Sequence, residues 1–391
     1  MRLIRDAYLI LSAKGVRTLA SGMVSVLTPI YLAKLGYPPL YVGMGVFLMI
    51  MGNVVSNMLL TWYGNVIGKR RLLIMLSVLM VISGFILMIT DSIPLLALAL
   101  LVGNISTTGT ETGPFQSVEV GVAPRLIGDK VSEFLGLYNL IGYSASSLGA
   151  LMTSLPSYFN GSIQVMRLMF ITYAAAGLIM LIIYLRLKAI DADYGGTRKV
   201  KLSKGAVDDI RRLTILFSVD AFGGGLVSQS LLSYWFYLRY GVSLRGLGVV
   251  FMVVNVITAL SLVLAPLLAR RIGTLNTMVF THLTSNIFLI LIPISSTFIG
   301  SLAFLLLRQS LSQMDVPTRQ TLMAHIFNND HERITANAIT NTARSISSLP
   351  GSPIVGLALS MGLFQLPFIL SGVMKIMYDA SIFILYKDRE H

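Results

Sequence analysis

Cysteine is absent from this chain of 391 residues, which excludes disulfides, thiolate catalysis and cysteine-based metal sites together. Histidine is scarce as well, with four in the chain. The sequence places one cluster of histidine and acid, His325, His331 and Glu332, and its spacing matches no zinc motif. A nucleophile elbow is also missing. These absences argue against an enzyme, and we expect no cofactor.

Charge is the next scarcity: 12% of residues are charged and 55% are hydrophobic, and the mean hydropathy is +0.77. A soluble domain does not need this composition. Apolar segments of about 20 residues or more recur, and each is long enough to cross a hydrocarbon layer of about 30 Å. The sequence therefore predicts an all-α integral membrane fold. Its twelve predicted spans are residues 7–35, 39–63, 71–90, 93–122, 131–156, 165–187, 211–239, 244–269, 275–293, 297–326, 333–360 and 363–386.

Lysine and arginine are unevenly distributed between the loops on the two sides of these spans. With the N-terminus in the cytoplasm, the outer side keeps little beyond Lys34, Arg167, Arg239 and Arg245. By the positive-inside rule we expect a multi-pass protein of the plasma membrane with both termini cytoplasmic. The same asymmetry explains most of the net charge of +13, so this charge indicates contact with anionic lipids and no nucleic acid.

The two halves of the chain resemble each other at an offset of about 203 residues. Residues 17–25 align with 220–228, and residues 113–116 align with 316–319. A third match, one residue out of step, places Asn139, Ser146 and Gly149 on Asn341, Ser348 and Gly351. Duplication predicts two six-helix bundles, residues 1–187 and 211–391, joined by a polar cytoplasmic linker at 188–210. Two such bundles leave a central cleft that can open to either side, which is the geometry of a transporter.

The loop after the second span and the loop after the eighth carry related glycine and arginine patterns. The residues concerned are Asn65, Gly68, Lys69, Arg70, Arg71, Arg270, Arg271 and Gly273. With the twelve spans and the duplicated halves, they make the whole chain resemble the major facilitator superfamily. The resemblance implies two pseudo-symmetric six-helix bundles and a cytoplasmic gate at these residues.

The pattern departs from that of the superfamily at two positions. Asn65 replaces the usual acidic residue, and Thr61 stands where the leading glycine would be. In the superfamily that acid helps to latch the cytoplasmic gate, so a neutral amide predicts a weaker latch. Residues 220–225 (DAFGGG) and 314–320 (MDVPTRQ) are further similar to one little-characterised transporter subfamily, which implies no particular substrate.

Ionisable residues inside the predicted spans are the strongest functional signal. Each costs several kcal/mol in lipid unless it faces a wet cavity or a partner. The candidate residues of a substrate and proton pathway are Arg17, Asn104, Glu111, Asp220, Arg308, Asp315 and Arg344. The resemblance implies that spans one, four, seven and ten line the central cavity, and these spans carry all of the set except Arg344.

Spacing and symmetry relate several of these residues. Arg308 and Asp315 are seven residues apart, as are Asn104 and Glu111, so each pair is expected on one helix face. Arg17 and Asp220 occupy equivalent positions in the two halves and are candidates to pair across the cavity. We hypothesise that Asp220 or Glu111 carries a coupling proton, because burial brings a carboxyl group toward titration at the working pH. Arg17 and Arg308 would then hold an anionic or polar part of the substrate.

A structural interpretation of the same charges stays open. Arg17, Asp220, Arg308 and Asp315 would then form fixed ion pairs that tie helices together, and Asp315 would brace its own helix through Arg319. Glu119 is expected near the cytoplasmic end, as a gate or solvated carboxylate. Lys375 and Asp379 are expected to pair on a peripheral helix.

These features together predict a secondary active transporter that moves a small solute by alternating access, with proton coupling. A drug or metabolite efflux pump of broad specificity and a non-transporting receptor or scaffold are the alternatives, and the direction of transport stays open. The expected partners are a small-molecule substrate, protons and membrane lipids, and we expect a monomer.

Overall fold

A computed structural model describes residues 2–110, 113–187, 202–327 and 329–387. The regular structure in these ranges is helical throughout, which confirms the predicted all-α fold class. The first half of the chain forms α1 (Arg2–Lys34), α2 (Pro39–Tyr63), α3 (Lys69–Ile89), α4 (Ile93–Val102), α5 (Pro114–Ile127), α6 (Val131–Met152) and α7 (Ile163–Arg186).

The second half repeats this order with more interruptions. It forms α8 (Lys204–Leu226), α9 (Gln229–Tyr240), α10 (Leu244–Ile272), α11 (Thr274–Leu291), α12 (Phe298–Ser312), α13 (Asp315–Ile326), α14 (Asp330–Ser347), α15 (Gly351–Ser360) and α16 (Leu366–Tyr386). Residues 188–201 of the predicted linker lie outside the described residues, and α8 begins at Lys204.

Helices occupy the positions of all twelve predicted spans, and four of those spans consist of two helices each. Span four is α4 and α5, span seven is α8 and α9, span ten is α12 and α13, and span eleven is α14 and α15. Eight helical segments of the described chain are long and apolar enough to cross a membrane. Large apolar side chains such as Ile89, Leu260 and Ile384 are mostly exposed, as expected of surfaces that face lipid.

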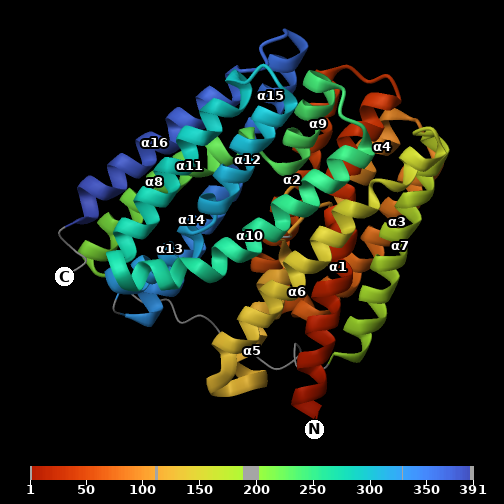
Figure 1. Ribbon diagram of the computed structural model, residues 1–391. Coiled ribbons are helices and arrows are strands. Elements are labelled where there is room, and N and C mark those ends of the chain that lie inside the picture. The colour runs from red at the N-terminus through yellow and green to blue at the C-terminus, as the bar shows by residue number, and fades with distance from the viewer. Residues whose placement is uncertain (1, 111–112, 188–201, 328, 388–391) are drawn as a thin grey trace. The chain divides into compact units, whose positions relative to one another are not determined.

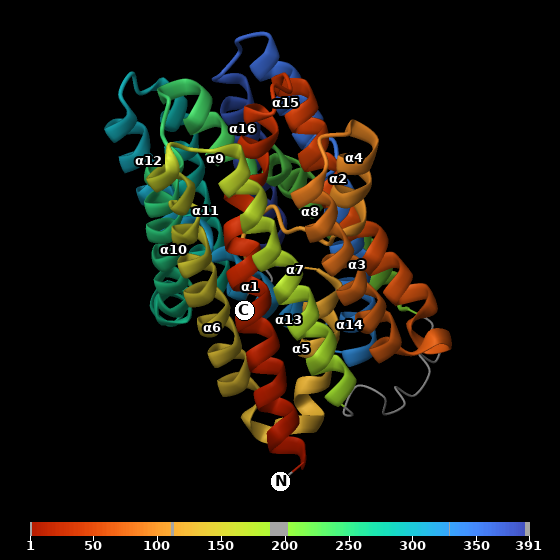
Figure 2. The same cartoon turned by 90° about the vertical axis from the view of Figure 1, so that its right-hand side faces the viewer.

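The described chain forms two compact units. Unit 1 contains residues 1–195 and 228–256, and unit 2 contains residues 196–227 and 257–391. In unit 1, α3 packs along α7 and α1 packs along α6 (Figure 2). In unit 2, α11 packs along α16 and α12, and α14 packs along α8 (Figure 1). Span seven is divided between the units, because α9 packs against α1 in unit 1.

Glycines at equivalent positions make the same close helix contact in each unit. A methyl group on Gly22 of α1 would overlap the carbonyl oxygen of Ser146 in α6, and one on Gly225 of α8 would overlap that of Ser348. Small residues let membrane helices approach this closely. These four residues are ones that the sequence repeat aligns, so the duplication is present in the packing as well.

Candidate functional site

Unit 1 contains a fully buried ion pair between Arg17 and Glu119. Arg17 lies on α1 and Glu119 on α5, and their side chains are 2% and 0% exposed. Arg17 Nη1 donates to Glu119 Oε1 at 3.0 Å and Nη2 donates to Oε2 at 2.8 Å. This bidentate geometry is the strong form of an arginine–carboxylate contact.

Two tyrosine hydroxyls complete this pair. Tyr138 donates to Glu119 Oε2 at 2.7 Å, and Tyr184 donates to Oε1 at 2.8 Å. Arg17 also lies over the ring of Phe115, 5.2 Å from its centroid. The carboxylate thus accepts four hydrogen bonds, which is what a charge buried in low dielectric requires. The arrangement braces helices α1, α5, α6 and α7 against one another.

These contacts correct two expectations. Arg17 was expected to pair with Asp220, but Glu119 in its own unit already neutralises it. Glu119 was expected to be a gate or solvated carboxylate, and it is instead completely buried. The sequence placed Glu119 near the end of span four, and it did not show that α1 brings a guanidinium to that depth.

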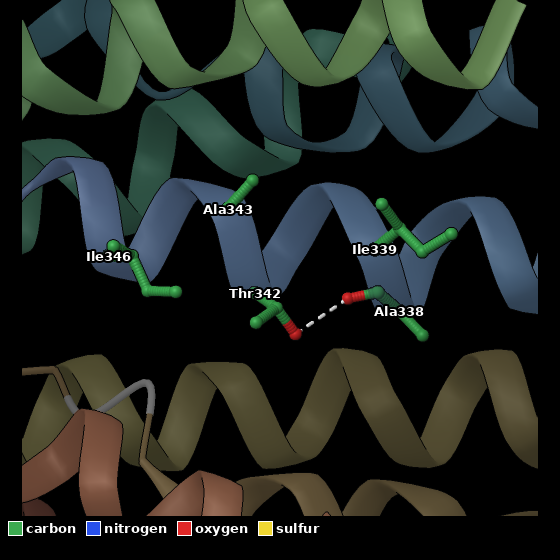
Figure 3. A pocket seen from close by; sticks show the side chains of 5 residues that line it. All are labelled: Ala338, Ile339, Thr342, Ala343 and Ile346. Atoms are coloured by element: carbon green, nitrogen blue, oxygen red, sulfur yellow. Dashed lines mark hydrogen bonds between the residues drawn. The ribbon is translucent and has the colours of Figure 1, made fainter.

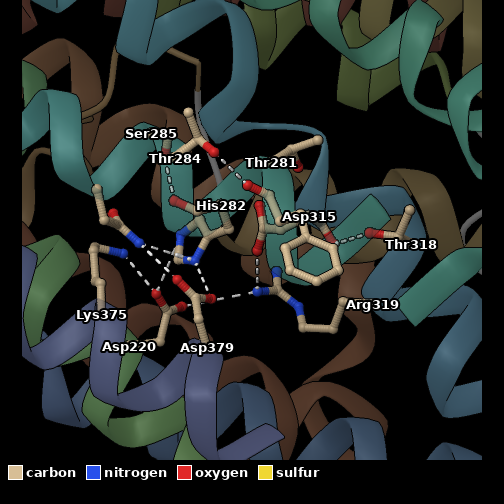
Figure 4. A network of polar contacts seen from close by, with 12 residues as sticks. Asp220, Thr281, His282, Thr284, Ser285, Asp315, Thr318, Arg319, Lys375 and Asp379 are labelled. Carbon is tan, nitrogen blue, oxygen red and sulfur yellow. Dashed lines mark hydrogen bonds and ion pairs between the residues drawn. The ribbon is translucent and has the colours of Figure 1, made fainter. Parts of the chain in front are cut away.

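Unit 2 contains a larger polar cluster centred on Asp220 of α8, which is 3% exposed. Asp220 Oδ1 accepts from Lys375 Nζ of α16 at 2.6 Å, and Oδ2 accepts from Arg344 Nη1 of α14 at 2.9 Å. Arg319 of α13 lies 3.9 Å from the same carboxylate. Figure 4 shows the side chains of Asp220, Lys375 and Arg319 converging from different helices.

A buried histidine joins this cluster to a second carboxylate. His282 Nδ1 of α11 lies 2.7 Å from Asp379 Oδ1, and its Nε2 lies 3.7 Å from Asp220 Oδ1. Asn286 donates to the other oxygen of Asp379 at 2.9 Å. His282 therefore stands between two carboxylates, Asp220 and Asp379, on the side facing α16 (Figure 4).

Three carboxylates and three permanent cations are thus gathered in unit 2. The third carboxylate, Asp315, accepts from Arg319 at 2.9 Å as its neighbour one helical turn away. The carboxylates are Asp220, Asp315 and Asp379, and the cations are Arg319, Arg344 and Lys375. With a neutral His282 the two sets balance. A proton on His282 adds one positive charge inside the membrane-spanning helices.

Sequence analysis missed His282 and misplaced Lys375 and Asp379. Lys375 and Asp379 were expected to pair with each other, but Lys375 binds Asp220 and Asp379 binds His282. The sequence indicated one cluster of histidine and acidic residues, in the loop that contains His331. The structure shows a second such cluster, formed by His282, Asp220 and Asp379. The available signal was a lone histidine inside span nine, and a lysine and an aspartate inside span twelve.

Arg308 and Asp315 do not share one continuous helix as predicted, because α12 ends at Ser312 and α13 begins at Asp315. Arg308 is buried, with 9% of its surface exposed. Its Nη1 donates to the side chain of Gln309 at 3.1 Å, and its Nε has no hydrogen-bond partner among the described residues.

Span four is unwound in its middle. Asn104 is buried in a left-handed conformation with φ of 53°, so it is not on a helix face shared with residue 111. Glu111 itself lies outside the described residues. The expectation that Asn104 and Glu111 share one helix face is therefore wrong for Asn104, which is not helical, and it stays untested for Glu111.

Side-chain and backbone donors from neighbouring helices satisfy carbonyls of the unwound part of span four. Tyr173 donates to the carbonyl of Gly103 at 2.6 Å, and Asn53 donates to that of Ile105 at 2.9 Å. Ser146 donates to the carbonyl of Gly109 at 3.0 Å, and the backbone N–H of Ser230 donates to Thr107 at 3.1 Å. Irregular backbone at membrane depth needs such partners, because lipid supplies none.

The two gate loops share a backbone feature. Gly68 and Gly273 have φ of 94° and 90° and directly precede α3 and α11. Glycine adopts this conformation without the strain that a Cβ would bring. Arg70 donates from Nε to the carbonyl of Tyr184 at 2.8 Å and from Nη2 to that of Leu185, so it binds the C-terminal end of α7, where a cation is favourable.

The other gate residues differ in exposure. Arg71, Arg270 and Arg271 are exposed and Lys69 is half-buried. The side chain of Asn65 lies outside what the structure describes, so the proposed weak latch stays untested.

A shallow apolar hollow lies along α14. It is lined by Ala338, Ile339, Thr342, Ala343 and Ile346 (Figure 3). The hydroxyl of Thr342 is bound to the carbonyl of Ala338 at 2.8 Å, so this face offers no free polar group to a solute. The charged cluster, not this hollow, holds the chemistry of unit 2.

Comparisons with known proteins agree with this architecture. The family model of the Major Facilitator Superfamily matches residues 10–312. Over 422 aligned residues the chain is 24% identical to the uncharacterized membrane protein YJR124C of Saccharomyces cerevisiae, with 98% of this chain and 94% of that protein covered.

Two solved structures share the fold. One is a variant of the nucleoside transporter NupG, with a TM-score of 0.76, 12% identity, and 97% of this chain and 100% of that chain covered. The other is a D-xylose-proton symporter, with a TM-score of 0.72, 16% identity and 97% of each chain covered. Because the family model spans most of the chain and the fold agrees over nearly its whole length, this protein belongs to the Major Facilitator Superfamily of membrane transporters.

Proposed function

We propose that this protein is a secondary active transporter that moves a small solute by alternating access and couples this movement to protons. The observation that carries the proposal is Asp220, a buried carboxylate bound by Lys375 and Arg344 and approached by His282. Charges inside membrane-spanning helices are costly, and they commonly mark substrate and proton pathways. Similarity to a D-xylose-proton symporter supports proton coupling as part of this proposal.

Within the cluster, His282 is the best candidate to take up the coupling proton. The sequence suggested Asp220 or Glu111 as the proton carrier. Glu111 lies outside the described residues, and Asp220 is bound by cations at 2.6 and 2.9 Å, which favour its charged form. Histidine ordinarily changes charge between about pH 5 and 8. The groups around His282 are Asp220, Asp379 and Asn286, the ring of Tyr378, and the cations Lys375, Arg344 and Arg319 on Asp220.

Protonation of His282 changes the balance of charge at Asp220. A charged imidazole between Asp220 and Asp379 competes with Lys375 and Arg344 for the same carboxylate. The competing partners lie on different helices, α11, α14 and α16, so a change of partner favours a different packing of those helices. Such a set of alternative pairs is a two-state element that a proton can bias.

The test uses the purified full-length protein in liposomes. A thermal-shift screen against metabolites and drug-like compounds first identifies a ligand, and its uptake is then measured with and without an inward proton gradient. We expect accumulation against the solute gradient only when the outside is acidic. A ligand that binds and is never carried across would indicate a receptor and overturn the proposal.

A matched pair of variants tests the role of His282. His282→Gln is expected to abolish accumulation driven by the pH gradient, because the protonatable group is lost. Solute exchange at equal pH should continue, because glutamine fills nearly the same space as histidine. His325→Gln removes an exposed histidine of α13 and should change neither measurement. Full gradient-driven accumulation by His282→Gln would contradict the assignment.

We also propose that the protein lies in the plasma membrane with both termini in the cytoplasm, and that residues 1–187 and 211–391 are its two bundles. The distribution of lysine and arginine supports the orientation. The repeated glycine contacts at Gly22 and Gly225 support the two bundles.

A further inference from the structure

We propose that the substrate is a small organic oxyanion with one negative charge, bound by Arg308 and Ser312 of α12. This inference rests on the proposed transport function and names the substrate class. It starts from two polar side chains on one buried stripe of α12, each with a buried atom that has no hydrogen-bond partner among the described residues. The stripe consists of Ser301, Leu305, Arg308, Gln309 and Ser312.

Arg308 is the first of these side chains. It is nine-tenths buried, and in the described part of the chain its side chain makes one hydrogen bond, from Nη1 to Gln309 Oε1 at 3.1 Å. Its Nε has no partner. The edge of the guanidinium that carries Nε and Nη2 is the edge that binds a carboxylate or phosphate through two parallel hydrogen bonds.

The second side chain is Ser312, one turn further along α12. It is 4% exposed, and its hydroxyl has no hydrogen-bond partner among the residues described. Residues four apart on a helix lie on the same face. A hydroxyl donor therefore accompanies the free guanidinium edge, and both groups are suited to the oxygens of one anion.

Gln309 and Thr258 orient the arginine. Gln309 accepts from Arg308 through its amide oxygen, and its amide nitrogen donates to the hydroxyl of Thr258 on α10. The chain of contacts leaves Nη1 occupied and directs the opposite edge away from Gln309.

The charges of unit 2 set the charge of the ligand. Arg319, Arg344 and Lys375 each lie within 3 Å of a carboxylate, at 2.9, 2.9 and 2.6 Å. Arg308 forms no ion pair in direct contact in the described structure, and the charges of Asp220 and Asp315 act on it from farther away. With Arg308 the cluster has four cations against three carboxylates, so it carries one excess positive charge when His282 is neutral. A buried excess charge is destabilising, and one negative charge on the substrate would balance it.

Binding is tested with the purified full-length protein and three anion–neutral pairs. The probes are lactate, benzoate and glycerol 3-phosphate, and their neutral counterparts are lactamide, benzamide and glycerol. We expect at least one anion to raise the melting temperature and its neutral counterpart to have no effect. The carboxylates and the phosphate ester distinguish the two chemical sources of the oxyanion. Absence of a shift with all three anions would overturn the inference.

Substitutions then locate the site. Arg308→Gln should weaken anion binding on the order of 10- to 100-fold, and Ser312→Ala by about 3- to 10-fold, in line with hydrogen bonds to a charged ligand. Arg308→Lys should restore part of the affinity. Arg211→Gln removes an exposed arginine of α8 and should leave binding unchanged. Unaltered affinity in Arg308→Gln would contradict the assignment.

Stability without ligand provides a second readout that does not depend on finding the substrate. Arg308→Gln should raise or preserve the melting temperature of the empty protein, because it removes a buried charge that no carboxylate contacts directly. Arg319→Gln should lower it, because Asp315 loses its partner. Equal destabilisation by both variants would show that Arg308 is structural. An anion that binds at Arg308 but never accumulates would leave this site standing and refute the transport proposal.

Discussion

At the scale of single residues, the two units carry buried charges of opposite sign at equivalent positions. Arg17 and Asp220 are equivalent in the sequence repeat, yet one is a cation and the other an anion. Each is neutralised within its own unit, Arg17 by Glu119 and Asp220 by Lys375 and Arg344. Low dielectric demands that a buried charge be paired, but it does not favour one sign over the other.

Removing one partner of the unit 1 pair should be costly. Glu119→Gln leaves Arg17 buried without a counter-charge, and we expect a loss of about 3–5 kcal/mol of unfolding free energy. Thermal and denaturant unfolding in detergent measure this. The control is Glu133→Gln, which alters an exposed carboxylate of α6. The double variant Arg17→Gln with Glu119→Gln should recover part of the loss, and a wild-type melting temperature in Glu119→Gln would contradict the interpretation.

The hydrogen bond from Tyr173 to the unwound part of span four provides a second prediction at this scale. Tyr173→Phe removes the hydroxyl bound to the carbonyl of Gly103 and leaves that carbonyl unsatisfied in a buried position. We expect a loss of about 1–3 kcal/mol in unfolding free energy. Tyr41→Phe changes an exposed tyrosine of α2 and serves as the control. Equal stability of the two variants would mean that span four does not depend on this contact.

At the scale of elements, interruption of helices is the main departure from the sequence prediction. Spans four, seven, ten and eleven were predicted as continuous, and each is two helices. Apolar composition shows where a segment crosses lipid, and it does not show whether its backbone stays helical. The partners that permit unwinding in span four, such as Asn53 and Tyr173, come from helices distant in sequence.

Close helix contacts at glycine provide an element-scale prediction. A methyl group on Gly149 of α6 would overlap the carbonyl oxygen of Leu19 in α1, whereas one on Gly136 of the same helix meets open space. Gly149→Ala should therefore cost about 1–3 kcal/mol of unfolding free energy. Gly136→Ala should be neutral or add about 0.5–1 kcal/mol, because alanine favours the helix. Similar melting temperatures for both variants in detergent would contradict the contact between α1 and α6.

At the scale of the whole molecule, the unequal distribution of basic residues predicts the orientation. The loops assigned to the cytoplasm carry Lys69, Arg70, Arg71, Arg270 and Arg271, and the net charge of the chain is +13. Anionic lipid headgroups on the cytoplasmic leaflet hold such loops. The whole chain is therefore expected to insert in a single orientation.

Reporter fusions test this orientation. A fluorescent protein fused to either terminus should remain inaccessible to externally added protease in intact cells and become accessible after permeabilisation. Replacing Lys69, Arg70 and Arg71 together by glutamine should yield a mixture of orientations, because those charges anchor the second loop. Cleavage of either terminal reporter in intact cells would refute the predicted topology.

The sequence by itself determined the membrane-spanning class, the positions of twelve spans, the duplication and the superfamily, because apolar length and repeated residues are properties of the chain alone. It also identified Arg17, Asp220 and Arg344 as charges inside lipid. Only the tertiary structure decided which groups meet. The partner of Arg17 is Glu119, and the partners of Asp220 include Lys375 and His282. These partners are between 60 and 160 residues away in the sequence, where spacing along the chain carries no information about contact. A buried charge must find some partner, and only packing selects which one.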